Sequence, residues 1–307
     1  MNASRFALLN DRGEVVREYR DSDLEVLAAA GRHFARFSCL LTSGDDTSVF
    51  LGSGTTLRIG QELFIMTARH VMAGLEESVP VLAWPSGLNE RIVINKGVQA
   101  RGHCDVACLR AEEDSVLHSD IEAVECNRLA FGVRDAGKDL LIVCGNPDTE
   151  WQVDAGKKEI RTQPWSMGAI SIPSTEWPNA EPEADKDSDL FLYYSAEFGF
   201  NSRGEPTPAL NPGGLSGGAI WRVPVSIDGK WSPNAAKLIA IQRSVEGREW
   251  KWLRATQIQH CLCLVWHKWP DTRDDIRRAL PCFESEYGET LQRKKTPLST
   301  LADCPEN

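Results

Sequence analysis

A serine set among glycines is the feature of this sequence best suited to covalent chemistry. The run Gly214-Leu215-Ser216-Gly217-Gly218 presents a hydroxyl on a segment that other backbone can approach, because glycine has no side chain to prevent it. A serine nucleophile with an adjacent oxyanion site requires a segment of this kind. We therefore take Ser216 as the candidate nucleophile.

Two hydrolase folds use such a serine, and the residues after it separate them. In an α/β-hydrolase the serine leads from a strand into a helix, and the acid and the histidine follow it in the chain. Here residues 219–225 are β-branched and aromatic and end near a proline, which predicts a strand. The only later histidines, His260 and His267, lie in a helical pattern. The catalytic partners of Ser216 are therefore expected upstream.

A histidine and an aspartate upstream each accompany an apolar run that predicts a strand. His70 lies near the end of residues 63–71, and Asp105 lies at the start of residues 104–109. The order His70, Asp105, Ser216 is one of the three known chain orders of a Ser-His-Asp triad. A serine hydroxyl is a poor nucleophile until a positioned imidazole accepts its proton, so the three residue types belong together.

With the turn-rich Gly52-Ser53-Gly54-Thr55, these segments resemble trypsin-like serine peptidases of the chymotrypsin fold. They are similar above all to the bacterial trypsin-like domains with signatures GSGF, TAAHV, DVALL and GxSGGP. The resemblance spans about residues 34–269, includes Gly145-Asn146-Pro147, and extends to no PDZ module. It implies an all-β, chymotrypsin-like double six-stranded β-barrel with short N-terminal and C-terminal helices.

The resemblance also implies a role for each candidate residue of a serine endopeptidase. Ser216 would attack the substrate carbonyl, His70 would act as general base and then general acid, and Asp105 would orient His70. The backbone N–H groups of Gly214 and Ser216 would form the oxyanion hole.

Three residues depart from the signatures. Leu215 stands where the digestive enzymes of this family carry an aspartate, which pairs with the new amino terminus after zymogen cleavage. Leucine cannot form that ion pair, so we expect regulation by a partner or by loop ordering instead of cleavage. Arg69 and Ala219 replace smaller or rigid residues of the signatures, and we expect neither to touch a reacting group.

The candidate substrate-binding residues follow from the same resemblance. Leu210, six residues before the nucleophile, occupies the position where an aspartate would select Arg or Lys. The predicted strand 238–242 is similar to the segment beside bound substrate, which makes Ala240, Ile241 and Gln242 candidate pocket walls. An apolar or small side chain before the scissile bond is the expected preference.

We expect four parts along the chain: an N-terminal extension with a short helix (1–33), a first β-barrel (34–137), a second β-barrel with an acidic insertion and a C-terminal helix (138–270), and a C-terminal extension (271–307). The insertion is residues 174–189, which contain six acidic residues and two prolines and read as a mobile, solvated surface loop.

Three helices are expected outside the strands. Ser22-Asp23-Leu24-Glu25 has the spacing of a capping box and predicts a helix through Ala30, with Gly31 as its stop. Residues 255–268 predict a second helix, which is similar to the family's C-terminal helix on the second barrel. Residues 274–280 predict a third.

Composition restricts the partners and the compartment. The net charge of −10 argues against general nucleic-acid binding, and no apolar run of about 18 residues predicts a membrane span. The N-terminal residues do not have the pattern of a secretion signal, so the nine cysteines are interpreted as reduced thiols and the location as cytoplasmic. Protein or peptide substrates and a regulatory protein partner are the expected partners.

The sequence leaves two alternatives to this interpretation. His260, Cys261, Cys263 and His267 are of types that bind zinc, but their spacing is not that of a zinc site, so neither a metal nor another cofactor is expected. A catalytically silent trypsin-like fold that acts as a peptide-binding module stays open, although an intact triad favours an enzyme. If Asp105 is not the acid, the next candidates are Asp114 and Asp120.

Overall fold

The structure is a computed structural model of the 307-residue chain. It describes residues 6–9, 14–44, 49–73, 79–88, 91–100, 104–112, 121–133, 139–148, 151–154, 159–194, 199–207, 212–224, 230–246, 252–288 and 298–300.

The first barrel closes from six strands. They run in the order β3, β4, β5, β8, β7 and β6, and β6 pairs back to β3, with every pair in the ring antiparallel. Their bounds are Ser38–Ser43 (β3), Val49–Ile59 (β4), Glu62–Thr67 (β5), Val81–Pro85 (β6), Ile92–Ala100 (β7) and Ala107–Ala111 (β8). Two short strands join this sheet from outside the ring: β9 (Val124–Glu125) and β20 (Leu298–Thr300).

The second barrel closes in the same way. Its ring is β10, β17, β18, β19, β14 and β13, and β13 pairs back to β10, again antiparallel throughout. The bounds are Leu140–Gly145 (β10), Trp165–Ser171 (β13), Asp189–Tyr194 (β14), Ala219–Val223 (β17), Lys237–Glu246 (β18) and Trp252–Gln257 (β19). The predicted fold class, two six-stranded barrels of the chymotrypsin type, is therefore confirmed.

The remaining strands lie outside the two rings. They are β15 (Gly199–Phe200) and β16 (Pro206–Thr207) at the edge of β13, and two hairpins: β1 (Phe6–Leu9) with β2 (Val15–Tyr19), and β11 (Trp151–Asp154) with β12 (Glu159–Thr162).

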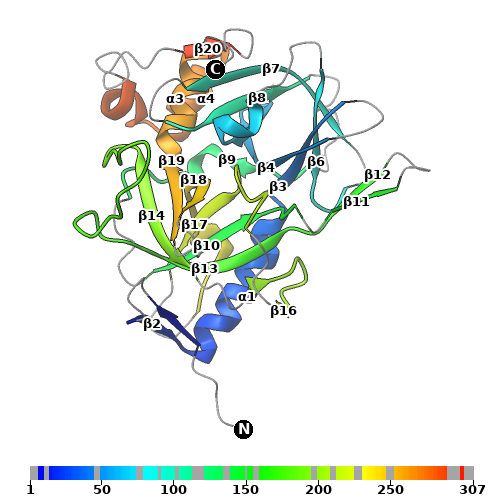
Figure 1. The fold of residues 1–307 in the computed structure, drawn as a ribbon. Coiled ribbons are helices and arrows are strands. Elements are labelled where there is room, and N and C mark those ends of the chain that lie inside the picture. The colour runs from blue at the N-terminus through cyan, green and yellow to red at the C-terminus, as the bar shows by residue number, and fades with distance from the viewer. Residues whose placement is uncertain are drawn as a thin grey trace.

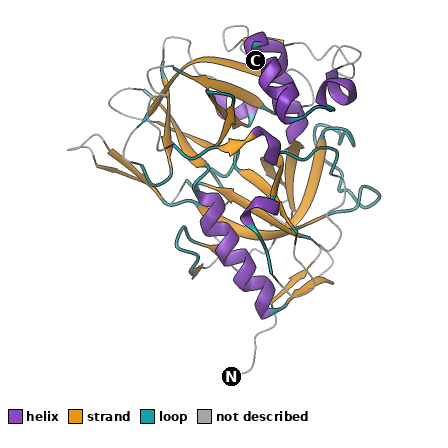
Figure 2. Cartoon of the chain, turned by 180° about the vertical axis from the view of Figure 1, so that it is seen from behind, coloured by secondary structure: helices purple, strands orange, loops and turns teal. Residues whose placement is uncertain are grey.

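Each long helix packs on the barrel that is farther away along the chain. Helix α1 (Asp21–Ala35), which precedes the first barrel, packs against β10 and β13 of the second. Helix α3 (Ile258–Lys268), which follows the second barrel, packs against β7 and β8 of the first as well as β18 and β19. Figure 1 shows α1 beside the lower barrel and α3 at the upper one, and Figure 2 shows the same arrangement from behind. The C-terminal helix was expected on the second barrel, and it packs there and on the first barrel as well.

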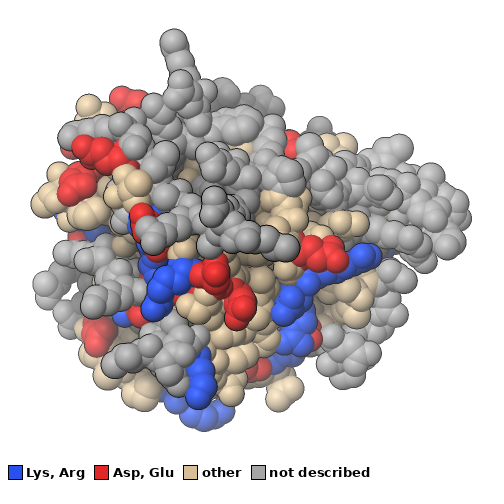
Figure 3. All heavy atoms as spheres, turned by 90° about the horizontal axis from the view of Figure 1, so that it is seen from below, with Lys and Arg blue, Asp and Glu red and all other residues tan. Residues whose placement is uncertain are grey.

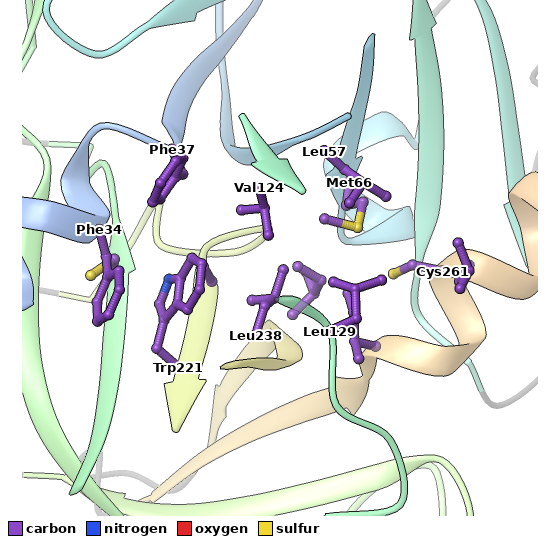
Figure 4. Close-up of a cluster of buried hydrophobic side chains, with 14 of the residues drawn as sticks. Phe34, Phe37, Leu57, Met66, Val124, Leu129, Trp221, Leu238 and Cys261 are labelled. Atoms are coloured by element: carbon purple, nitrogen blue, oxygen red, sulfur yellow. The ribbon is translucent and has the colours of Figure 1, made fainter. Parts of the chain in front are cut away.

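The space between the barrels is filled by a continuous apolar cluster. Trp221 of β17 stacks on Phe34 of α1 with the ring centroids 4.2 Å apart, and Phe37 contacts the same indole at 5.6 Å. The cluster continues from there towards α3, as Figure 4 shows for Val124, Leu238, Leu129, Leu57, Met66 and Cys261. Both barrels contribute side chains, so their relative position is fixed by shared burial.

The predicted helix limits needed correction. The N-terminal cap of α1 is Arg20, whose backbone N–H donates to the Asp23 carboxylate at 3.1 Å, so Ser22 is not the cap. Gly31 does not stop the helix but lies inside it. Glycine is required at this position because a Cβ would come within 2.1 Å of Ser166 Oγ on β13. Residues 255–257 belong to β19 and α3 begins only at Ile258, since the strand pairs there with β14 and β18. The third helix, α4, spans Arg273–Ala279.

Side-chain contacts join the acidic insertion to the second barrel, and its mobility stays a prediction. The Arg254 guanidinium donates to the carbonyl oxygen of Pro182 at 2.7 Å, and the Trp177 indole donates to the carbonyl of Ile172 at 2.9 Å. The Trp177 ring also packs on Phe191 of β14. Composition showed only the acids; the backbone carbonyls and the tryptophan attach the segment to the barrel.

The surface charges are mixed. On the face shown in Figure 3, Lys and Arg side chains lie next to Asp and Glu side chains and form no single basic area among the described residues. Among the helices described here, none is long and apolar enough to cross a membrane.

Candidate active site

His70 and Asp105 meet because their strands are neighbours in the first barrel. β5 and β8 pair with Thr67 opposite Ala107, His70 follows β5 on a 3₁₀ turn (Arg69–Met72), and Asp105 precedes β8. The expected strand 63–71 thus ends at Thr67. His70 Nδ1 lies 2.6 Å from Asp105 Oδ2, and the His70 backbone N–H donates to Oδ1 at 2.9 Å.

The exposure of the two groups differs. The Asp105 side chain is buried, whereas 49% of the His70 side chain is exposed. Burial by itself raises the pKa of Asp105, but the two hydrogen bonds from His70 and the charges of His70 and Arg243 outweigh it and hold this pKa below its usual range. Asp105 is therefore an ionised carboxylate at neutral pH, able to orient the imidazole and to stabilise its protonated form.

Two arginines flank the same carboxylate. Arg69 Nε lies 3.9 Å from Asp105 Oδ1, and Arg243 Nε lies 3.5 Å from Oδ2. The expectation that Arg69 touches no reacting group is therefore wrong, because Arg69 is within ion-pair distance of the candidate acid. Arg243 was not singled out from the sequence at all, and it approaches Asp105 from β18 of the other barrel.

The half-buried Ser216 is placed on the loop before β17. Its hydroxyl donates to the backbone carbonyl of Arg243 at 3.0 Å, and no hydrogen bond joins it to His70 among the described residues. The structure thus brings His70 and Asp105 into direct contact but leaves Ser216 turned towards β18. Catalytic hydrogen bonds are often long or unformed without substrate, so the missing Ser216–His70 bond does not by itself exclude Ser216 as the nucleophile.

The loop that carries Ser216 is tied to the first barrel by Gly52-Ser53-Gly54-Thr55. The Ser53 N–H donates to the Ser216 carbonyl at 2.8 Å, and the Ser53 hydroxyl donates to the Gly214 carbonyl at 2.7 Å. The Thr55 hydroxyl donates to the Gly217 carbonyl at 3.1 Å. Sequence reasoning used this segment only as part of a signature and missed the role of the buried Ser53 hydroxyl.

Two glycines permit this close contact. Gly217 has φ +92°, and a Cβ there would lie 1.9 Å from the carbonyl oxygen of Ser53. Gly214 has φ +86°, and a Cβ there would lie 2.6 Å from the backbone nitrogen of Asp148. Both positions thus require glycine for backbone conformation and for clearance.

The candidate oxyanion donors are free of other described acceptors. The Gly213 carbonyl accepts from Asp148 N–H at 2.9 Å, so the Gly214 N–H, on the opposite side of the same trans peptide, points away from Asp148. Within the described part of the chain, nothing accepts a hydrogen bond from the N–H of Gly214 or of Ser216. An oxyanion site requires donors that are unoccupied in this way.

The candidate substrate-binding residues lie beside this loop where they are described. Ala240, Ile241 and Gln242 are buried on β18, and the Gln242 backbone exchanges hydrogen bonds with Gly217 and Gly218, each at 2.8 Å. Among the described residues, nothing pairs with the buried Gln242 side-chain amide. Leu210 lies outside the described residues, as do the alternative acids Asp114 and Asp120.

Burial disfavours the thiolate forms of Cys104, Cys261 and Cys263. Cys104 directly precedes Asp105, and burial raises the pKa of its thiol to about 11. Cys261 and Cys263 are buried on α3, where burial raises both thiol pKa values further. In the described ranges, no three His, Cys, Asp or Glu side chains gather as a metal site.

The closed double barrel is the fold of the chymotrypsin-like proteases. No family model and no curated protein matches the sequence. Among solved structures, an inactive form of Rv3671c from M. tuberculosis H37Rv is similar over 79% of this chain and 91% of its own, with 13% identity and a TM-score of 0.40. The HtrA-type protease AlgW, solved with a tripeptide, is similar over 76% of this chain with 17% identity and a TM-score of 0.45. This chain spans only 61% of AlgW.

Proposed function

We propose that this protein is a serine endopeptidase that cleaves protein substrates through Ser216, His70 and Asp105. The observation that carries the proposal is the pair of hydrogen bonds from His70 to the buried Asp105 carboxylate. A histidine fixed in this way can accept a proton at Nε2, because Nδ1–H is already held by the carboxylate. The loop that carries Ser216 supports the same proposal, because hydrogen bonds hold it to the barrel that carries His70.

The proposed reaction has two stages, acylation of Ser216 and hydrolysis of the acyl-enzyme. Ser216 Oγ bonds to the substrate carbonyl carbon while its proton passes to His70 Nε2, and the oxyanion accepts from the N–H groups of Gly214 and Ser216. The C–N bond then breaks as the amine takes the proton from His70, and water hydrolyses the acyl-enzyme ester by the same route. Each oxyanion donor contributes about 3 to 4 kcal/mol in comparable sites.

Regulation by ordering of the site, rather than by zymogen cleavage, belongs to this proposal. Leu215 is fully buried in the core of the second barrel, where it packs with Ile220 and Val143 and cannot pair with an amino terminus. In the proposed scheme, the Ser216 hydroxyl must leave the Arg243 carbonyl and hydrogen-bond to His70 before attack. Binding of substrate or of a partner protein supplies that step in the proposed scheme.

A fluorophosphonate probe tests the proposal without knowledge of the substrate. Wild-type protein should be labelled at Ser216, and Ser216→Ala and His70→Ala should not be labelled although both fold. Ser232→Ala is the control, because Ser232 is an exposed serine of the second barrel and its loss should leave labelling unchanged. Labelling that persists in Ser216→Ala would refute the assignment of the nucleophile.

A catalytically silent peptide-binding module is the second candidate, and one observation favours it. The Ser216 hydroxyl is hydrogen-bonded to the Arg243 carbonyl and not to His70. If this is its fixed state, the protein should bind peptides yet resist the probe at every pH and with every peptide added. Absence of labelling together with measurable peptide binding would select this function over the first.

We propose a reducing, cytoplasmic compartment and an apolar or small substrate residue before the scissile bond. Support for the compartment comes from the eight described cysteines, all of which are free thiols, seven of them buried. Support for the preference comes from the buried Ala240 and Ile241 beside the nucleophile loop. A peptide library screened with the active protein would measure the preference directly.

A further inference from the structure

The second barrel sends a buried arginine to the candidate catalytic acid. Only 8% of the Arg243 side chain is exposed, and it lies between two carboxylates. Its Nε is 3.5 Å from Asp105 Oδ2 and its Nη1 is 3.4 Å from Asp189 Oδ1. One guanidinium thus joins the acid of the first barrel to β14 of the second.

Asp189 is itself held from three sides. The fully buried Arg254 contacts Asp189 Oδ2 through Nη2 at 2.7 Å, and the backbone N–H of Asp185 donates to the same oxygen at 2.8 Å. Arg254 also donates to the carbonyl oxygens of Pro182 at 2.7 Å and Glu183 at 3.2 Å. The chain of contacts therefore runs from the acidic insertion to the candidate catalytic acid.

The charges along this chain alternate: Asp105, Arg243, Asp189 and Arg254. A buried charge is tolerated when it is paired and hydrogen-bonded, and removing one member leaves its neighbour unpaired. An arginine suits the central position because its planar fork reaches two carboxylates at once, which a lysine ammonium does less well. Arg243 also approaches Oδ2, the oxygen that His70 Nδ1 contacts, so the imidazole and the guanidinium share one acceptor.

We propose that Arg243 is a positioning residue of the triad, held by Asp189 and Arg254, and that it sets the pH at which the triad becomes competent. This inference rests on the proposed function. In the described residues, the titratable or charged side chains that face Asp105 are His70 and Arg69 from the 3₁₀ turn and Arg243 from β18. Because Arg69 is more exposed and more distant, Arg243 is the better shielded cation.

The sign of the effect follows from the charges. Without the positive charge of Arg243, the negative charge of Asp105 acts more strongly on His70 and stabilises its protonated imidazole. His70 would then become available as a base only at a higher pH. The acid limb of the rate profile should therefore move up by about one pH unit in Arg243→Gln, the size expected for a unit charge at short range in a partly screened site. Arg243→Lys keeps the charge and should restore most of the wild-type profile.

Asp189→Asn gives a change of opposite sign. It removes the negative charge that compensates Arg243, so the acid limb should move to lower pH. A purely structural role for the network would lower rates in both variants without moving either limb. Two shifts in opposite directions are therefore the signature of positioning through charge.

The test measures the rate constant of fluorophosphonate labelling from pH 4 to 9 for the full chain and the three variants, with melting temperatures to show that each folds. Arg222→Gln is the matched control, because Arg222 also pairs with an aspartate, Asp139, but near the end of β17 that is away from the loop. Its acid limb should stay in place. An unmoved acid limb in folded Arg243→Gln would overturn the proposal.

A second readout separates this inference from the proposed function. The proton between His70 Nδ1 and Asp105 is followed by NMR during a pH titration in the Ser216→Ala background, where no turnover is needed. A titration midpoint that moves up in Arg243→Gln supports the positioning role of Arg243 even if wild-type protein is never labelled. Absence of labelling would refute only the proposed peptidase activity. Labelled wild type with unmoved midpoints refutes only the positioning role.

Discussion

The Asp105 carboxylate has more partners than a triad requires. It accepts two hydrogen bonds from His70 and lies within ion-pair distance of Arg69 and Arg243. Such a carboxylate is fixed in position as well as in charge. Its replacement therefore has separate consequences for the reaction and for stability.

Asp105→Asn should lower kcat by about 10⁴, because an amide at this position permits the wrong tautomer of His70 while the loop and the oxyanion donors remain. Turnover of a sensitive ester or the labelling rate measures this loss. The control is Asp274→Asn on the exposed surface of α4, which should leave both rates unchanged. An Asp105→Asn protein with nearly full activity would show that another acid acts in its place.

The stability that Asp105 contributes should depend on pH. Because its pKa is lower in the folded chain than in the unfolded chain, the contribution is present above the ordinary aspartate pKa of about 4 and is lost as the pH falls through the native value. Urea unfolding at pH 7 and near pH 3 measures it. The difference in unfolding free energy between wild type and Asp105→Asn should shrink at the lower pH, and a difference that grows would contradict the direction of the shift.

Ser53 should matter more for reactivity than for folding. Ser53→Ala removes the donor to the Gly214 carbonyl and should loosen the loop that carries Ser216. Labelling should then fall about 10- to 100-fold, as expected when a positioning contact to a reacting group is lost. Thr56→Val is the matched control, since the Thr56 hydroxyl is equally buried on β4 but bonds to Phe37 and Glu122, away from the loop. Both variants should lose about 1 to 3 kcal/mol of stability, and equal labelling of the two would refute the role of Ser53.

At the level of elements, β4 and the loop before β17 lie so close together that the contact leaves no room for an added side chain at Gly217. Gly217→Ala should prevent the loop from docking, because its Cβ would collide with the Ser53 carbonyl. Gly87→Ala is the control: Gly87 also has positive φ, at +80°, but nothing lies within 4 Å of the added Cβ. We expect Gly87→Ala to cost about 1 to 2 kcal/mol and keep full labelling, and Gly217→Ala to lose labelling. Labelling of both at wild-type rates would mean that the loop tolerates displacement.

The elements also show what the sequence can predict. Apolar runs before His70, after Asp105 and after Ser216 predicted β5, β8 and β17, because burial on both faces of a strand leaves a direct compositional signal. The end of α1 was mispredicted, since the requirement for glycine at Gly31 comes from Ser166 on a distant strand. The Arg243 network was missed for the same reason: its partners come from β14, β19 and the first barrel, and pairings of that range leave no local pattern.

At the scale of the whole molecule, the two barrels should unfold together. Phe34 is fully buried and stacks on Trp221, so it links α1 to β17 through the cluster shared by the barrels. Phe34→Ala should cost about 3 to 5 kcal/mol and lower the urea midpoint of a single transition. Leu24→Ala on the same helix is the control, since Leu24 is only partly buried. Two separate transitions in the wild type would show that the barrels are independent.

Because α1 packs on the second barrel and α3 contacts the first, cutting the chain between the barrels has a specific consequence. A break between Val133 and Asp139 leaves one piece with the first barrel and α1, and another with the second barrel and α3. Helix α1 packs on the other piece and α3 packs on both pieces, so the nicked halves should stay associated and separately produced halves should find each other in solution. Because His70 and Asp105 lie on one half and Ser216 on the other, probe labelling of mixed halves would then report reassembly, with chain continuity no longer a condition for reactivity.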